Sequence, residues 1–364
     1  MYPSYQNLDI SRYFTSWGFY TLGYVQHHRP DIELIPIRFK NFNEHIEVHD
    51  KVNYDWLAHC INQALSQGKI VGLLPEDEHV AGPPNTQLTQ IVNQVAEKSV
   101  YWLTQLDQVA HREVYHNDHG MRCRMLELPW CLLNDCLTYY RVRREAVPNA
   151  RSQHNFLCMV NNQETHKMQL LTELHRAGLD RYGRLTLSRR TPGFEFCKIN
   201  GYNPYSDVPE GCSVIGACTL IDNVWISKNV ENFLYIEQTY NHIPLIINAE
   251  TMIGQFMNTE KSIWPVLLGH LFLIWGRPGT MAWIQKFYDI DIESFANTEY
   301  DNICGDTLQE QTTRSLQQLL TNNQALIQSA ADIKYQLQHD LQAARWTFGQ
   351  NMYNFFVEQL KQIA

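Results

Sequence analysis

The sequence places a glutamate and a lysine side by side where a helix is predicted to begin, in the segment Thr259-Glu260-Lys261-Ser262. A helix N-terminus carries free N–H groups and a partial positive charge, which favour a phosphate. In that first turn a glutamate can accept hydrogen bonds from both hydroxyls of a ribose, and the adjacent lysine can pair with a diphosphate. A plain capping interaction is the alternative, because acidic residues are common in first turns. The segment therefore predicts either a nucleotide site or a capped helix.

A second group of polar residues, Glu76, Asp77 and His79, follows the apolar run Ile70 to Leu74. This short run predicts a buried strand, which Pro75 ends. Catalytic groups of α/β proteins lie at the carboxyl edge of the sheet, where a carboxylate or an imidazole can take a proton from a hydroxyl. A solvated acidic loop explains the same residues, so the group predicts either a general base or a surface loop.

A histidine-rich segment has spacings that can converge on a metal ion. Imidazoles and carboxylates are zinc ligands, but the segment contains no strong metal-binding motif. Acceptor binding or a plain surface loop fits it better, and we expect no metal site. The residues are His111, Glu113, His116, Asp118 and His119.

The elements that must position these residues alternate between helix and strand. In the first half, apolar spacing predicts a helix from Asn53 to Gly68, a strand from Ile70, a helix from Thr86 and a strand from Val100. A second set begins at Asn155. Its predicted elements are a strand over 156–160, a helix to about 177, a strand over 243–248, a helix from 260 to about 269, a strand over 271–275 and a helix over 281–288. Alternation at these lengths predicts an α/β fold with parallel sheets.

The charged, proline-containing stretch 141–151 is the predicted linker between two domains, 1–150 and 151–305. From residue 306 to 364 the chain is glutamine-rich and carries a leucine stripe at helical spacing, with a kink expected over 347–351 around Gly349. These C-terminal helices either pack back on the domains or form a coiled coil with a partner.

Composition narrows the class of protein. The chain has 364 residues, with 29 Lys and Arg against 38 Asp and Glu and a formal charge of -9. This charge disfavours binding to nucleic acid through phosphate neutralisation. No apolar stretch reaches the roughly 18 residues of a membrane span, and the N-terminus does not resemble a signal peptide, so we expect a cytoplasmic protein. Nine cysteines without a Cys-x-x-Cys pair indicate neither a disulfide framework nor a zinc ribbon.

Several blocks of the second half resemble a group of bacterial and phage glycosyltransferases. Residues 156–162 and the pair His166-Lys167 look like the first strand, loop and helix of that group. Residues 248–251, followed by 259–279, match its donor-domain signature TEK(S/T)…P…G…FL..G.PG. The segment is also similar, more distantly, to the donor domain of the alpha-1,3-fucosyltransferases. The resemblance covers about residues 155–303.

This resemblance implies a GT-B fold, in which two Rossmann-like domains face a cleft and the C-terminal one holds a nucleotide-sugar. By position, Glu260 would hold the ribose and Lys261 the diphosphate. The other residues placed at the donor are Asn161, Asn162, His166, Lys167, Glu250 and Thr259. The sequence departs from the pattern at Gln163-Glu164-Thr165, where the group has arginines, and at Trp264, where it has lysine. Both departures remove positive charge near the phosphates.

The implied activity is transfer of a sugar from a nucleotide-sugar to a hydroxyl acceptor on a surface glycan, a protein or a modified base. No cofactor is expected, and no metal either, since a lysine and a helix N-terminus can neutralise the leaving diphosphate. The alternative, suggested by the reduced positive charge, is a catalytically silent protein that binds a nucleotide or a carbohydrate.

Overall fold

The structure is a computed structural model of the whole chain. It describes residues 19–37, 54–75, 86–95, 99–104, 120–130, 132, 133, 136, 154–160, 165–188, 213–215, 242–250 and 260–363. By its internal contacts the chain divides into two units. Unit 1 comprises Met1–Leu137 with Met352–Ala364, and unit 2 comprises Thr138–Asn351. We had expected boundaries at 150 and 305; in this division the C-terminal helices belong partly to each unit.

Unit 1 is built on a parallel sheet in the order β1-β2-β3-β4. The strands are β1 (Ile32–Ile37), β2 (Ile70–Pro75), β3 (Val100–Thr104) and β4 (Arg124–Glu127). The helices among its described residues are α1 (Phe19–His28), α2 (Tyr54–Ser66) and α3 (Thr86–Gln94). The apolar stripe of α2 packs on the sheet, because Leu57, Ile61 and Ala64 belong to the same buried cluster as Trp102. Spacings of three and four residues place such side chains on one helix face.

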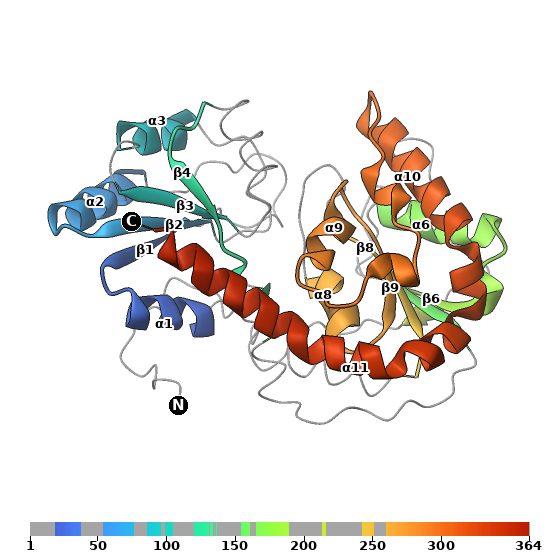
Figure 1. Cartoon of the computed structure of the whole chain (residues 1–364). Coiled ribbons are helices and arrows are strands. Elements are labelled where there is room, and N and C mark those ends of the chain that lie inside the picture. Colours follow the sequence, from blue (N-terminus) through green and yellow to red (C-terminus); the bar gives the residue numbers. More distant parts are fainter. Residues whose placement is uncertain are drawn as a thin grey trace. The chain divides into compact units, whose positions relative to one another are not determined.

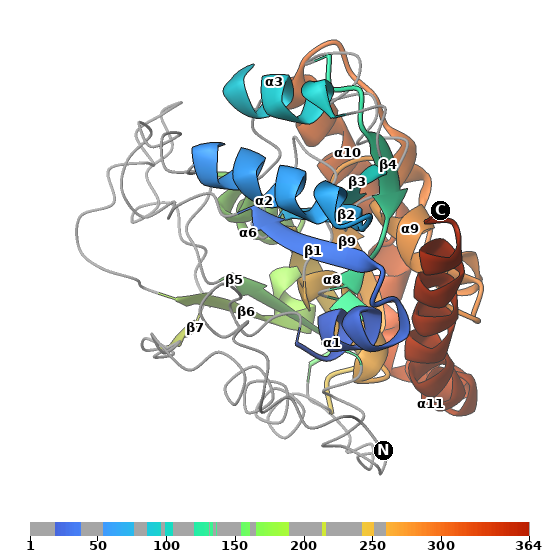
Figure 2. The same ribbon diagram turned by 90° about the vertical axis from the view of Figure 1, so that its left-hand side faces the viewer.

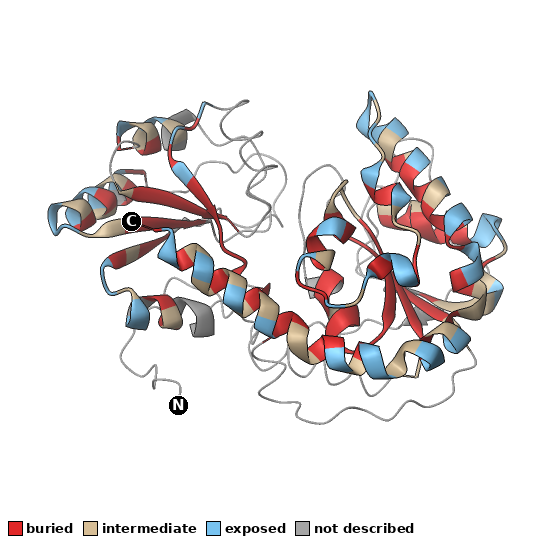
Figure 3. Ribbon diagram, viewed as in Figure 1, coloured by how far each residue is buried: buried red, intermediate tan, exposed pale blue. Residues whose placement is uncertain are grey.

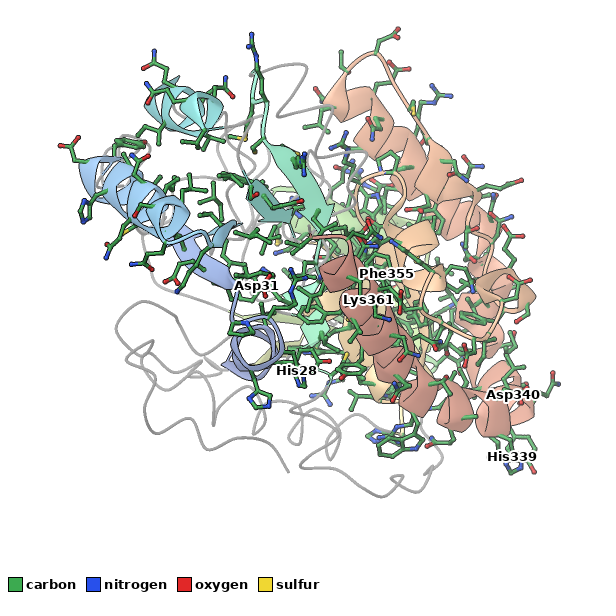
Figure 4. All side chains as sticks on the ribbon, turned by 60° about the vertical axis from the view of Figure 1, so that its left-hand side comes forward. His28, Asp31, His339, Asp340, Phe355 and Lys361 are labelled. Atoms are coloured by element: carbon green, nitrogen blue, oxygen red, sulfur yellow. The ribbon has the colours of Figure 1, made fainter. Side chains whose placement is uncertain are left out.

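The last residues of the chain also belong to unit 1. The long helix α11 (Gln324–Lys361) ends beside α1, where Arg29 donates hydrogen bonds to the carbonyl oxygens of Leu360 at 2.6 Å and Ile363 at 2.9 Å. Asp31, which pairs with Arg29 at 2.7 Å, and Lys361 are both labelled in Figure 4. A cation on the last carbonyls of a helix satisfies groups that have no partner within the helix.

Unit 2 contains a five-stranded parallel sheet in the order β7-β6-β5-β8-β9. Figure 2 labels β5, β6 and β7, and Figure 1 labels β8 and β9. The strands are β5 (Phe156–Val160), β6 (Gly183–Ser188), β7 (Ser213–Ile215), β8 (Leu245–Ala249) and β9 (Leu271–Trp275). Its helices are α6 (Thr165–Arg176), α8 (Glu260–Leu267), α9 (Thr280–Gln285), α10 (Leu308–Asn322) and the first part of α11, with short 3-10 turns at Asp180–Tyr182, Ile292–Ser294 and Glu299–Asn302. Every residue of β8 and β9 is buried (Figure 3), as expected for strands covered on both faces.

The strand order of unit 2 reverses between β5 and β8. From β5 the chain continues outward through β6 to β7, and then returns to the other side of β5 to form β8 and β9. In unit 1 the described strands follow one another in sequence order, so no reversal occurs among them.

The predicted α/β class with parallel sheets is confirmed. The described strands form two parallel sheets, and the chain ends in a helical section. The GT-B class stays a prediction. The predicted kink over 347–351 is wrong, because α11 continues through Gly349 and departs from helical geometry at Ser329 instead. There the Ser329 hydroxyl donates to the carbonyl of Ala325 at 2.6 Å, a bond that commonly bends helices. Burial of Phe348 and Met352 outweighs the roughly 1 kcal/mol cost of a helical glycine.

Candidate functional site

The carboxyl ends of β5 and β8 form the candidate site of unit 2. In open parallel sheets a crevice lies outside the carboxyl ends of the strands where the strand order reverses, and ligands bind there. Along the chain, helix α6 is the next described element after β5, and Glu250 directly follows β8. The topology thus brings together segments that lie far apart in the sequence.

Glu250 joins three elements at this edge. Its backbone N–H donates to the carbonyl of Trp275 at the end of β9, at 2.8 Å. One oxygen of its carboxylate accepts a hydrogen bond from the hydroxyl of Ser262 in the first turn of α8. Both side chains are fully buried. A carboxylate beside the N-terminus of a helix is stabilised by the helix dipole, so Glu250 fixes the beginning of α8 against the sheet.

His166, in the first turn of α6, completes this arrangement. Its Nε2 lies 2.8 Å from the backbone oxygen of Glu250. Because a carbonyl can only accept, Nε2 carries the hydrogen of this bond. The imidazole packs edge-on against the ring of Trp275, with the ring centroids 6.2 Å apart. We therefore find His166, Glu250 and Ser262 in one hydrogen-bonded group, which we call the switch-point network.

The other sequence-predicted donor residues divide into three sets. Glu260 and Lys261 are the first two residues of α8, directly before Ser262, and their side chains are not among the described ones. Lys167 is buried in α6. Asn161, Asn162 and Thr259 lie outside the described residues, as do the candidate bases Glu76, Asp77 and His79 and the histidine-rich segment.

The turn after β9 brings a further cation, Arg277, to the same edge of the sheet. Beyond it, α9 begins at Thr280, and the carboxylate of Asp301 lies at its first N–H groups. Asp301 accepts from the N–H groups of Met281 at 2.9 Å and Ala282 at 3.3 Å. Burial raises the pKa of Asp301 to about 7, although these N–H bonds act in the opposite direction. The first N–H groups of α9 therefore already have a side-chain acceptor.

Sequence reasoning missed this role of Asp301. Its carboxylate reaches back 20 residues to cap a helix, and no local pattern signals a contact of that range.

No group of three histidine, cysteine or acidic side chains capable of holding a metal occurs in the part of the chain that the structure describes. The sequence contains one Asp-x-Asp triplet, Asp289-Ile290-Asp291. Both carboxylates have protein partners. Asp289 accepts from the Asn351 amide at 2.7 Å, and Asp291 accepts from the N–H of Glu293 at 3.1 Å. The described helices include none long and apolar enough to cross a membrane.

Comparison with known proteins adds a weak structural likeness. No protein-family model matches the chain, and no curated protein is similar to it in sequence. A DNA-modifying beta-glucosyltransferase, solved with and without uridine diphosphoglucose, aligns over 91% of this chain and 99% of its own, at 9% identity and a TM-score of 0.39. The catalytic domain of starch synthase IV from Arabidopsis thaliana, bound to ADP and acarbose, aligns over 85% and 77%, at 9% identity and a TM-score of 0.40. At these scores neither likeness bears on function, and the resemblance to the bacterial, phage and fucosyltransferase groups stays a prediction.

Proposed function

We propose that the chain is a glycosyltransferase, which moves a sugar from a nucleotide-sugar donor to an acceptor hydroxyl. The observation that carries this proposal is the switch-point network. It ties the first turn of α8, with Glu260 and Lys261, to the strand ends where the sheet order reverses. Nucleotides in α/β proteins bind at such a position, with their phosphates toward a helix N-terminus.

The donor residues then have separate tasks. Glu260 accepts hydrogen bonds from the ribose hydroxyls, and Lys261 pairs with the diphosphate at the N-terminus of α8. The side chains of Asn161, Asn162, Lys167 and Thr259 complete the donor side. Glu250 holds α8 in place through Ser262.

The reaction breaks the bond between the sugar and the diphosphate oxygen and forms a bond from the sugar to the acceptor oxygen. The leaving diphosphate is stabilised by Lys261 and the helix N-terminus without a metal. One of Glu76, Asp77 and His79 takes the proton of the acceptor hydroxyl. The acceptor is a surface glycan, a protein or a modified base, and the charge of -9 places nucleic acid last. We propose a cytoplasmic site of action.

A second candidate function is supported by the reduced charge of the donor segment. Gln163, Glu164 and Trp264 replace cations that the resembling group carries. A protein of this kind would bind a nucleotide or a carbohydrate and would not transfer the sugar.

Thermal unfolding with a panel of nucleotides tests both candidates. We expect one of UDP, GDP or ADP, or its sugar conjugate, to raise the midpoint. A ligand at 100 times its dissociation constant adds about 2.7 kcal/mol, which is several degrees for a domain of this size. Glu260→Ala and Lys261→Ala should lose the shift, whereas Glu310→Ala and Lys361→Ala, at exposed ion pairs, should keep it.

The outcomes separate the candidates. No response of the wild-type chain to any nucleotide refutes the donor site. Binding without breakdown of any nucleotide-sugar, in the presence of acceptor extracts, favours the silent protein over the enzyme.

A further inference from the structure

The turn after β9 holds Arg277 in one backbone conformation. The carbonyl oxygen of Arg277 accepts from the hydroxyl of Thr280 at 2.8 Å and from its N–H at 3.1 Å. A Cβ atom on Gly276 would stand 2.5 Å from the Thr280 hydroxyl oxygen, so glycine is required for this packing. The position from which the Arg277 side chain departs is therefore fixed at the carboxyl edge of the sheet.

The guanidinium of Arg277 has no partner among the described residues, and the residue is half-buried. Two other arginines of unit 2 have a carboxylate partner: Arg176 pairs with Glu173 at 2.6 Å, and Arg314 with Glu310 at 3.3 Å. A planar cation that is held at a turn without a counter-charge is available to an anionic ligand.

The neighbouring carboxylates are already engaged elsewhere. Asp301 directs its carboxylate to two backbone N–H groups of α9. Glu299 accepts from two side-chain amides of α10, at 3.0 and 3.4 Å. Among the described residues, neither acid neutralises Arg277.

Backbone contacts link Arg277 to the switch-point network. The carbonyl of Trp275, two residues before Arg277, accepts the N–H of Glu250, whose carboxylate takes the hydroxyl of Ser262. Arg277 and the first turn of α8 therefore follow adjacent strands, β9 and β8, at the same edge of one sheet.

We propose that Arg277 binds the diphosphate of the donor and sets the preference of the site for nucleoside diphosphates over nucleosides. This inference rests on the proposed function. Arginine forms two parallel hydrogen bonds to a phosphate group, whereas lysine acts as a point charge. Arg277 supplies, from the turn after β9, positive charge that Gln163 and Trp264 do not carry.

Isothermal titration calorimetry on the full chain tests this role. The probes are UDP, GDP and ADP, each compared with its free nucleoside. Arg277→Gln should weaken binding of the preferred diphosphate about 10- to 100-fold and change binding of the nucleoside less than about twofold. Arg277→Lys should bind the diphosphate with intermediate affinity, and this affinity should fall with added salt as it does for the wild type. Arg277→Gln should show a weaker dependence of affinity on salt.

The matched control is Arg176→Gln. Arg176 is the last residue of α6, about 15 Å along the helix axis from His166 in its first turn. Because Arg176 forms an exposed ion pair, its replacement should leave nucleotide binding unchanged.

Three results would overturn the inference. If Arg277→Gln binds the diphosphate as the wild type does while Lys261→Gln does not, the donor site stands and Arg277 has no part in it. Equal weakening of diphosphate and nucleoside assigns Arg277 a structural role only. If the wild type binds no nucleotide, the proposed function falls and this inference falls with it.

Discussion

Replacing Lys334 by methionine should stabilise the protein at neutral pH. Lys334 is buried in α11, 6% exposed, with its Nζ 3.3 Å from Nδ1 of the fully buried His270. The same His270 atom lies 2.7 Å from the carbonyl of Ile243. Burial, together with the nearby charge of Arg345, lowers the pKa of Lys334 from 10.5 to about 7. The fold thus disfavours the ammonium form that the unfolded chain carries.

The size of the effect follows from this shift. The difference between 10.5 and about 7 is about 3.5 pKa units, and each unit corresponds to about 1.4 kcal/mol. Because Lys334 is half protonated in the folded protein at pH 7, its lowered pKa reduces the free energy of unfolding there by about 4 kcal/mol at most. The pKa is lowered on folding, so the unfolded state binds more protons between pH 7 and 10.5. Stability therefore rises with pH through this window, and below pH 7 the cost is fully present.

The assay is denaturant unfolding of wild type and Lys334→Met at pH 7 and pH 10. We expect the variant to be about 2 to 4 kcal/mol more stable at pH 7 and to differ by less than about 1 kcal/mol at pH 10. Lys361→Met, on the exposed face of the same helix, is the control and should change stability by less than about 0.5 kcal/mol at either pH.

Two results would refute the reasoning. A variant less stable than the wild type at pH 7 means that the contacts of Lys334 outweigh the cost of burying it. A difference that is equal at pH 7 and pH 10 means that protonation of Lys334 is not its source.

Three further predictions concern other buried polar contacts. Burial raises the pKa of Asp301 from 3.8 to about 7, so stability should fall as pH rises through that range, and urea titrations of Asp301→Asn should show a weaker decline. Arg29→Met removes two hydrogen bonds to the end of α11 and should cost about 1 to 3 kcal/mol, with faster hydrogen exchange over 352–361; Arg176→Met is the exposed control. Glu250→Ala leaves the buried Ser262 hydroxyl without its acceptor and should weaken nucleotide binding in a titration about tenfold or more, whereas Glu250→Gln should retain most of it. Equal behaviour of the Ala and Gln variants of Glu250 would contradict the positioning role.

Much of the local structure could be predicted from the sequence. The helix predicted to begin at Glu260 does begin there, because first-turn chemistry is a local property of the chain. The strands predicted from Ile70 and over 271–275 are also present, since short continuous apolar runs favour burial on both faces of a sheet. By contrast, the kink of α11 depends on a hydroxyl bond at Ser329 and on packing around Gly349, which periodicity does not encode.

The candidate site shows the same division. The sequence alone determined that His166, Glu250, Glu260 and Lys261 lie where a helix begins or a strand ends. Only the tertiary structure decided that β5 and β8 pair across the reversal of strand order, which brings residues 84 positions apart into a hydrogen bond. The pairing of β8 with β9 puts Glu250 and Arg277 after the ends of neighbouring strands. Long-range packing also brings the Asp301 carboxylate to the first N–H groups of α9. The residue types determine which chemistry is available at each position. The packing of segments far apart in the sequence determines which of these groups come into contact.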